Sequence, residues 1–410
     1  MVGFVASVCF GLLLSLASPT PIHAADPAFR QFLDTLRPEA QQQGVTRTTF
    51  EAATRDLEPD LSLPDLVIPG RAERQRGEQA EFVQTPADYL KDTTIARLAA
   101  QGLKLATAHR ATLATIEQLY GVPGDVVLAI WGRETNYGAA KLPHNAIRAL
   151  ATQAYLGRRK DQFRQEFLLA LKMLQEGHVA AAAMRSSWAG AMGHPQLLPS
   201  GFYEHAVDFD GDGRRDIWNS VPDALATIAK HLADLGWQRG IRWAYEVRIP
   251  NNADCTIAEP DVKAPIADWL KRGFAPAYDR KLRADERAQD ASLLLPAGLY
   301  GPGFLVPKNY FAIKDYNFSD LYVLFVGHLS DRIGDPRAFE TPWGQVVQLR
   351  ASALEAIQRG MTARGLYRDK IDGKAGMKTR SALGAYQKAS GLTVDCWPSE
   401  AVLQHMQRSR

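Results

Sequence analysis

The stretch "AIWGRETNYG", residues 129–138, decides the fold because it places a carboxyl group on the apolar side of a predicted helix. Pro123, Gly124 and Asp125, a few residues before it, are suited to open a helix, which we expect over residues 125–137. Four side chains recur there at the i, i+3, i+4 and i+7 spacing that defines one helical face: Val127, Ile130, Trp131 and Glu134. Glu134 is therefore expected to face the core.

A carboxyl group in apolar surroundings has two interpretations. Burial disfavours its charged form and raises its pKa, so that Glu134 can hold a proton near neutral pH and donate it to a leaving oxygen. The alternative is a structural glutamate that caps or pairs within the core. Helical spacing alone leaves both interpretations open.

Composition bounds the remaining possibilities. The chain has 410 residues, 46% of them hydrophobic and 23% charged, which is typical of a globular protein with two or three domains. The formal charge of +3 is too balanced to indicate a nucleic-acid partner. Beyond the N-terminus, the sequence contains no apolar run long enough to predict a transmembrane helix.

The N-terminus predicts export. Residues 1–24 read as a secretory signal peptide, which implies a periplasmic protein; the alternative is a buried N-terminal helix. The mature chain then keeps two cysteines, Cys255 and Cys396. They are far apart in sequence and fall in different predicted domains, so we expect two separate thiols rather than a disulfide, although an exported protein can form one.

Hydrophobic periodicity divides the chain. Helical patterns occupy 26–55, one long amphipathic segment at 94–121, and 161–177. From about residue 240 to about 315, the sequence alternates in hydrophobicity as strands do and is rich in glycine and proline, which predicts a small β insertion in a helical domain. A helical pattern follows at 319–333. We therefore expect a catalytic domain over 25–334, a linker over 335–345 and a compact unit of two or three helices over 346–410.

Several stretches resemble one family in the family's order: "TPADYL" at 85–90, "AIWGRETNYG", "AGAMGHPQLLPSGFYEHAVDFDGDGRRDIWNSVPDAL" at 189–225 and "NYFAIKDYN" at 309–317. The family is that of the lytic murein transglycosylases of the membrane-bound lytic transglycosylase B type. The resemblance covers nearly the whole mature chain. It implies a mainly α (α+β) fold, with a lysozyme-like helical catalytic domain that carries a small β insertion.

The resemblance also implies a reaction. The family cleaves the β-1,4 bond between N-acetylmuramic acid and N-acetylglucosamine in peptidoglycan. The C6 hydroxyl of muramic acid, and not water, attacks C1 and leaves a 1,6-anhydro end. One carboxyl group acts first as acid and then as base, without the second carboxylate of most glycosidases. The resemblance assigns that role to Glu134.

Further cleft residues are carried over by motif. They are a serine that hydrogen-bonds the catalytic carboxyl, a glutamine beside the cut, a tyrosine near the glutamate and an arginine pair: Ser187, Gln196, Tyr316, Arg158 and Arg159. Taken alone, each is an ordinary loop or surface residue. His194 and Leu197 depart from the family's commoner residues, which leaves subsite preference open.

An acidic loop over 208–219 has the spacing of a calcium-binding EF-hand loop. We expect no cofactor to be required for the cleavage chemistry, so a calcium ion here would be structural. Its predicted ligands stand at loop positions one, three, five, seven, nine and twelve: Asp208, Asp210, Asp212, Arg214, Asp216 and Asn219. Position twelve is normally a bidentate glutamate, so Asn219 removes one charge and one oxygen. We expect a weak structural calcium site; the alternative is an acidic turn without metal.

Residues 365–395 resemble the small helical peptidoglycan-binding domain that often accompanies wall enzymes. Such a domain raises the local concentration of an enzyme whose polymeric substrate cannot diffuse to it. The alternative is a helical unit that only packs on the enzyme. The sequence thus predicts a monomeric lytic transglycosylase whose partner is peptidoglycan, with a water-using muramidase or a non-catalytic wall-binding protein as alternatives.

Overall fold

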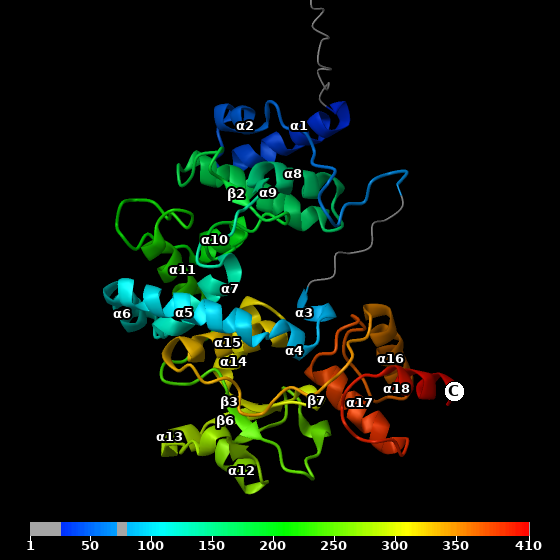
Figure 1. Ribbon diagram of the computed structural model, residues 1–410. Helices are drawn as coiled ribbons and strands as arrows, with labels where there is room; N and C mark the ends of the chain where they lie inside the picture. The colour runs from blue at the N-terminus through cyan, green and yellow to red at the C-terminus, as the bar shows by residue number, and fades with distance from the viewer. Residues whose placement is uncertain (1–25, 72–79, 410) are drawn as a thin grey trace, which may run out of the picture.

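The computed structural model describes residues 26–71 and 80–409. These residues form a helical lobe, a central bundle of helices, a small sheet region and a C-terminal helical domain, as Figure 1 shows from top to bottom and at the right. The predicted mainly helical fold with a small β insertion is confirmed. The predicted signal peptide lies outside the described residues.

The helical lobe brings together segments far apart in sequence. Its elements are α1 (Pro27–Gln42), α2 (Arg47–Thr54), β1 (His144–Asn145), α8 (Ala146–Leu156), α9 (Lys160–Gln175), β2 (Arg185–Ser186) and α10 (Pro199–His205). The two short strands pair antiparallel. Phe29 of α1 and Phe167 of α9 are buried in the shared core. The predicted helices over 26–55 and 161–177 are present in this lobe.

The central bundle holds the most deeply buried helices. It comprises α3 (Ala80–Val83), α4 (Pro86–Tyr89), α5 (Asp92–Ala108), α6 (Arg110–Tyr120), α7 (Gly124–Thr135), α11 (Val221–Asp234), α14 (Lys308–Tyr316) and α15 (Asp320–Gly334). α7 packs against α5 and α15. The prediction of one long segment over 94–121 was wrong, because the helix ends at Ala108 and a new one begins at Arg110. Both helices, α5 and α6, bury an apolar stripe, so the hydrophobic periodicity of the sequence continues across the break between them.

The β-rich region is a five-stranded sheet of order β4-β6-β8-β3-β5 whose neighbours all pair antiparallel. Its elements are β3 (Tyr245–Arg248), η1 (Cys255–Ile257), β4 (Lys263–Pro265), α12 (Ile266–Lys271), β5 (Ala275–Pro276), η2 (Ala277–Asp279), α13 (Ala284–Arg287), β6 (Asp290–Leu294), β7 (Pro296–Leu299) and β8 (Gly303–Val306). The strand texture expected up to residue 315 was wrong beyond residue 307. That segment forms α14, whose Tyr310 and Ile313 are buried in the central core.

The C-terminal domain consists of three helices, as predicted: α16 (Ala351–Ala363), α17 (Met377–Ala389) and α18 (Glu400–Arg408). Gln358 organises it, since its side-chain oxygen accepts hydrogen bonds from the backbone of Asp372 and Gly373 at 3.0 and 2.9 Å. Residues 335–345, the predicted linker, form no helix or strand. They are nevertheless held down, because the Glu340 carboxylate pairs with Arg248 at 2.9 Å.

A disulfide joins the sheet region to the C-terminal domain. Cys255 and Cys396 are bonded, and both residues are buried. The expectation of two separate thiols was wrong, because the two domains dock face to face and bring together cysteines that lie 141 residues apart. Beside this bond, Ser381 donates a hydrogen bond to the Thr256 carbonyl at 2.6 Å. The C-terminal domain is therefore a fixed part of the molecule rather than a loose tether.

A buried ion pair strengthens the same junction. Arg380 of α17 contacts Asp320 of α15 at 3.0 Å, and both side chains are less than a tenth exposed. Asp320 also accepts a hydrogen bond from Tyr310 at 2.7 Å and pairs with Lys314. Two cations and a hydroxyl hold the pKa of Asp320 well below its usual range, although burial alone would raise it.

No single helix among the described residues has the length and apolar composition needed to cross a membrane. Within the part of the chain that the structure describes, α6 and α7 pass that test as a pair, and they are bent by 107° at their junction.

Candidate active site

Glu134 stands in the last turn of α7, where the backbone is strained. The three residues after Thr135 all adopt left-handed conformations, with φ values of 49°, 58° and 80° at Asn136, Tyr137 and Gly138. Such conformations are costly for residues other than glycine and cluster at functional sites. Tyr137 is held in place because its hydroxyl donates to the Leu98 carbonyl at 2.9 Å.

The side chain of Glu134 has one hydrogen-bond donor among the described residues. The Tyr322 hydroxyl donates to Oε1 of Glu134 at 2.5 Å, from the first turn of α15. The residue is only half-buried, yet its surroundings remove water from the carboxyl group, and this burial raises its pKa. The Tyr322 hydrogen bond opposes that shift, because it favours the charged form.

Two charged neighbours also act on Glu134. Arg133 lowers the pKa of the Glu134 carboxyl and Glu81 raises it. The Arg133 guanidinium lies 4.9 Å from the ring centres of both Tyr89 and Phe325, so it is held beside the site by aromatic faces. Glu81 belongs to α3 and was not predicted from the sequence. It is the carboxylate whose charge acts most on the Glu134 pKa among the described residues.

A tight turn segment, residues 186–197, lies against the end of α7. The indole nitrogen of Trp131 donates to Nδ1 of His194 at 2.7 Å, which requires that ring nitrogen to be unprotonated. Thr135 also donates to the His194 carbonyl at 3.3 Å. Burial lowers the pKa of His194, which keeps the ring neutral. His194, which departs from the family pattern, thus joins the turn segment to α7, the helix that carries Glu134.

Tyr316 meets the same turn from the opposite side. Its hydroxyl donates to the Pro195 carbonyl at 2.8 Å, and its ring is stacked on that of Tyr322 at 6.5 Å. Glu134 raises the pKa of Tyr316 electrostatically, after burial itself. The structure therefore brings Tyr316 and Glu134 together around Tyr322.

Ser187 and Gln196 lie in the turn segment, but neither side chain forms a hydrogen bond with Glu134. The Ser187 hydroxyl accepts a hydrogen bond from the Ala191 amide at 3.2 Å, and the Gln196 amide nitrogen donates to the Gly193 carbonyl at 2.9 Å. Gln196 adopts a left-handed conformation with φ of 55°. Both side chains are half-buried and shape the turn beside the carboxyl group.

The arginine pair lies between α8 and α9. Arg158 pairs with Asp65 at 3.2 Å, and the Arg159 guanidinium lies 4.9 Å above the ring of Phe163. Neither arginine forms an ion pair with Glu134 in the described structure. They belong to the helical lobe.

Three residues of the acidic loop converge. Oxygens of Asp208, Asp210 and Asp212 lie within 4.8 Å of one another, as ligands of one cation would. Asp216 does not join them, since its oxygens accept from the amide nitrogen of Asn219 at 3.0 and 3.2 Å. The donor set therefore fits a divalent cation through three carboxylates.

Asp223 supports this loop and was not predicted from the sequence. It is fully buried and accepts hydrogen bonds from the backbone of Phe209, Asp210 and Asp216 at 2.8, 3.2 and 2.9 Å. Its position outside the twelve-residue loop gave no signal from spacing. The loop is thus anchored to α11 by protein hydrogen bonds.

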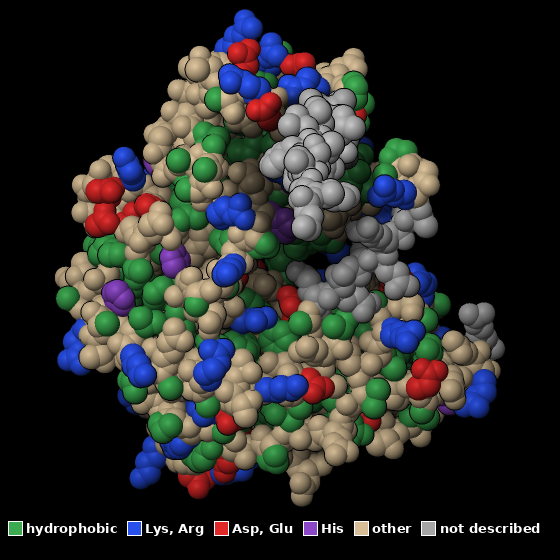
Figure 2. All heavy atoms as spheres, turned by 45° about the horizontal axis from the view of Figure 1, so that its top comes forward, with side chains coloured by type: hydrophobic (Ala, Val, Ile, Leu, Met, Phe, Trp, Pro, Cys, Tyr) green, Lys and Arg blue, Asp and Glu red, His purple; other side chains and the backbone are tan. Residues whose placement is uncertain are grey.

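The face of the molecule in Figure 2 carries no single-sign patch, because Lys and Arg are interspersed there with Asp and Glu. A cavity of about 490 Å³ lies between the central bundle and the C-terminal domain, and Glu81 and Phe318 are among its lining residues. Glu81 thus both lines this cavity and raises the pKa of Glu134. A larger cavity of about 670 Å³ lies at the other end of α7 and does not include Glu134.

Comparisons with known proteins assign the chain to a family. A family model described as the transglycosylase SLT domain matches residues 28–331, and a peptidoglycan binding domain model matches residues 350–406. Membrane-bound lytic murein transglycosylase B of Escherichia coli is 30% identical over 223 residues. That alignment covers 53% of this chain and 58% of the relative, so the chain spans little more than half the length of that protein.

Solved structures give a fuller match. SltB3 from Pseudomonas aeruginosa, crystallised in complex with NAG-NAM-pentapeptide, is 37% identical, with a TM-score of 0.83 over 92% of this chain and 99% of that chain. The soluble lytic transglycosylase SltB1 of the same organism is 26% identical, with a TM-score of 0.59 over 76% of this chain and 99% of that one. The chain therefore belongs to the transglycosylase SLT domain family, among the lytic murein transglycosylases of the membrane-bound B and SltB type.

Proposed function

We propose that this protein is a lytic transglycosylase of peptidoglycan, which cleaves the β-1,4 bond between N-acetylmuramic acid and N-acetylglucosamine and leaves a 1,6-anhydro end. The observation that carries the proposal is a carboxyl group, Glu134, with a raised pKa and a single fixed hydrogen bond from Tyr322. The similar SltB3 protein was crystallised with both NAG-NAM-pentapeptide and NAG-anhNAM-pentapeptide, which supports the same substrate and product for this chain.

Glu134 acts first as the acid. Because Tyr322 donates to Oε1, the carboxyl proton sits on Oε2, which is the oxygen free to face a glycosidic bond. Burial raises the pKa of Glu134, so the carboxyl holds its proton to higher pH than an exposed glutamate does. The proton passes to the leaving oxygen as the bond to C1 breaks.

Glu134 acts next as the base. The resulting carboxylate accepts the proton of the muramic acid C6 hydroxyl, whose oxygen then forms the bond to C1. Tyr322 stabilises this charged form and so acts as a positioning residue that also balances the two roles. Ser187, Gln196 and Tyr316 line the glycan cleft around this carboxyl group in our proposal, and Arg158 and Arg159 extend it toward the helical lobe.

A water-using muramidase on the same scaffold is the second candidate, and Glu81 is the observation that favours it. A second carboxylate near the acid can activate water in a glycosidase. Glu81 is half-buried and accepts no hydrogen bond from the described residues that would orient it toward a water molecule. We therefore retain Glu134 as the lone acid and base.

The direct test is Glu134→Gln, an isosteric change that removes the titrating group. We expect muropeptide release from purified sacculi to fall by about 10³-fold or more, while the thermal unfolding midpoint and binding to sacculi persist. Unchanged release by a folded variant would rule out the assignment.

We also propose a weak calcium site at Asp208, Asp210 and Asp212. Three carboxylates that converge supply hard oxygen ligands. Asp223 fixes the loop backbone by accepting a hydrogen bond from the Phe209 amide. Calcium then stabilises the loop and takes no part in bond cleavage. Millimolar calcium should raise the unfolding midpoint of the wild type but not of Asp210→Asn.

We further propose that the protein works in the periplasm and that its C-terminal domain contacts peptidoglycan strands. The disulfide between Cys255 and Cys396 supports an oxidising compartment, because such bonds persist outside the cytosol. The match to a peptidoglycan binding domain supports the second part. Fractionation of the producing cells and sacculus pull-down with Glu134→Gln test both parts.

A further inference from the structure

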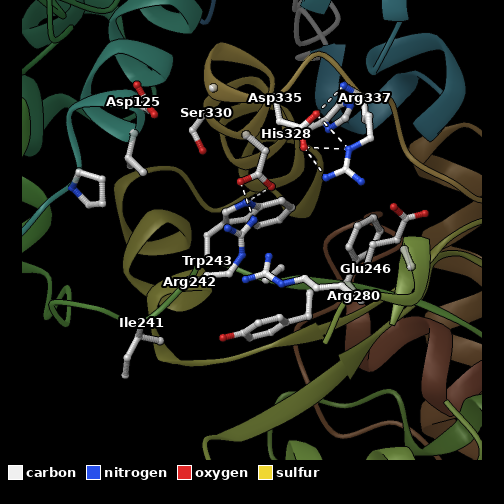
Figure 3. Close-up of a pocket in the computed structure, with 18 of the residues that line it drawn as sticks. Asp125, Ile241, Arg242, Trp243, Glu246, Arg280, His328, Ser330, Asp335 and Arg337 are labelled. Carbon is white, nitrogen blue, oxygen red and sulfur yellow. Dashed lines mark hydrogen bonds and ion pairs between the residues drawn. The ribbon is translucent and has the colours of Figure 1, made fainter. Parts of the chain in front are cut away.

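The cavity of about 670 Å³ at the start of α7 has the features of a second binding site. Its walls come from α6, the first turn of α7, the loop before β3, η2 and the end of α15, and the segment after α15 closes it. Figure 3 shows that its labelled side chains come from several of these walls, with Arg242, Trp243 and Arg280 in the middle. Trp243 and Phe304 give it an apolar, buried floor.

One end of the cavity carries carboxylates without cationic partners. Asp125 and Glu117 form no ion pair or hydrogen bond through their side chains with any described residue, although Asp125 is half-buried. Burial raises the pKa of Asp125, and the nearby charges of Glu117 and Asp331 raise it further. A positively charged group at this position would relieve all three effects at once.

The other end carries arginines with donors to spare. Arg242 pairs with Asp331 through one terminal nitrogen at 2.6 Å, while its buried Nε has no acceptor. Arg280 uses one terminal nitrogen on Glu286 at 2.9 Å. Both guanidinium groups act electrostatically on Asp331, so they lie near the same point, and Figure 3 draws both reaching into the centre of the cavity. A guanidinium has five N–H donors, so a carboxylate can be held here.

Backbone strain marks the mouth. Tyr278 and Asp279 both adopt left-handed conformations, with φ of 54° and 48°. Tyr278 is kept there because its amide donates to Glu340 at 2.6 Å and its hydroxyl donates to the Ala338 carbonyl at 2.8 Å. Tyr278 is 44% exposed at the opening, where a ligand that enters can contact it.

We propose that this cavity binds a diamino dicarboxylic acid, with an ammonium of one of its ends at Asp125 and Glu117 and a carboxylate of its other end at Arg242 and Arg280. The aliphatic chain lies along the aromatic floor. Both free diamino acids and peptides that contain them carry this chemistry. The site lies at the opposite end of α7 from Glu134, so it goes beyond the proposed lytic function and does not depend on it.

The test is isothermal titration calorimetry of the full chain with meso-2,6-diaminopimelate as the probe. We expect saturable binding with a Kd of about 1 mM or tighter. Pimelate lacks the ammonium groups and cadaverine lacks the carboxylates, so each should bind about tenfold more weakly or worse. Absence of saturable binding, or equal affinity for either analogue, would overturn the site.

Matched variants locate the binding. Asp125→Asn should weaken the Kd about tenfold or more, whereas Asp161→Asn, which changes an exposed carboxylate at the same position of the first turn of α9, should leave it unchanged. Equal effects of the two variants would contradict the assignment. Thermal unfolding confirms that Asp125→Asn is folded, and Arg280→Gln provides a second variant at the carboxylate end.

Two further arms separate this site from the lytic function and identify the source of its ligand. Glu134→Gln should bind the probe with the wild-type Kd, whatever its effect on lysis. Loss of binding in that variant would place the probe in the lytic cleft and refute the second site. Competition by a stem tripeptide that ends in the same diamino acid supports the site and identifies wall peptide as its source. Binding of the free diamino acid alone supports the site with a free amino acid as its ligand.

Discussion

At the scale of single residues, the chemistry rests on the contact between Glu134 and Tyr322. Glu134 could be predicted because it stands at helical spacing with Val127, Ile130 and Trp131. Tyr322 could not, since it lies 188 residues further along the chain and only tertiary packing brings its hydroxyl to Oε1. The serine expected to hold the carboxyl group instead accepts from a neighbouring amide.

Tyr322→Phe tests that contact. The hydrogen bond favours charged Glu134 and lowers its pKa, so its loss raises that pKa further. We expect kcat to fall by roughly 10–100-fold, because the base form is no longer stabilised. The fall in activity at high pH, where the acid form is lost, should move to higher pH. A pH–rate profile measures both effects.

Tyr203→Phe provides a matched control for this change. It removes a tyrosine hydroxyl that also donates to a carboxylate, at 2.6 Å to Glu176, far from the site. That variant should keep the wild-type profile. A Tyr322→Phe enzyme with an unmoved profile would show that the hydroxyl has only a structural role.

Glu81→Gln distinguishes one working carboxylate from two. Glu81 raises the pKa of Glu134, so removal of its charge should lower that pKa and shift the loss of activity to lower pH. At its optimum the variant should keep activity within about threefold of the wild type, since Glu81 transfers no proton in this mechanism. Loss of a hundredfold or more would instead point to a two-carboxylate hydrolase.

At the scale of elements, α7 is more buried than its sequence pattern indicated. The helical stripe predicted one apolar face, yet Val126, Leu128 and Ala129 are buried as well, because α5, α11 and α15 surround the helix. A hydrophobic period identifies a helix but cannot show how many neighbours cover it. For the same reason, the break at His109 between α5 and α6 was not visible.

Gly132→Ala tests the packing of α7. A Cβ at Gly132 would lie 2.7 Å from Cζ of Tyr137, whose hydroxyl is fixed by the Leu98 carbonyl. Overpacking should lower the free energy of unfolding by about 1–3 kcal/mol, which outweighs the gain in helix propensity. Urea unfolding measures the change.

The control is Gly201→Ala in α10, where the nearest atom would be an ordinary 3.5 Å away. That variant should be neutral or slightly more stable than the wild type. If both variants unfold at the same urea concentration, Tyr137 does not pack on α7 as described.

At the scale of the whole molecule, the C-terminal domain is docked. The sequence showed its three helices and its likeness to a wall-binding domain, but not its placement. That placement depends on the bond between Cys255 and Cys396 and on the pair between Arg380 and Asp320, contacts whose partners lie 141 and 60 residues apart. Long-range pairing of this kind leaves no local pattern, so the docking could not be predicted.

Reduction of the disulfide tests the docking. The bond closes a loop of well over a hundred residues, so Cys255→Ser with Cys396→Ser should cost about 2–5 kcal/mol of unfolding free energy. Dithiothreitol should lower the unfolding midpoint of the wild type and leave that of the double variant unchanged. Labelling of both thiols shows that the disulfide has been reduced. If the fully reduced wild type then unfolds at the same temperature as the oxidised protein, the disulfide does not stabilise the docked domain.

Mass spectrometry of the muropeptides that the wild-type protein releases from purified sacculi in ¹⁸O-labelled water shows directly which nucleophile attacks C1. A lone Glu134 that activates the C6 hydroxyl predicts 1,6-anhydro ends, each one water lighter than a reducing end and free of ¹⁸O. Reducing ends that carry ¹⁸O would show that water attacks C1, and would contradict the role of Glu134 as the base for the C6 hydroxyl.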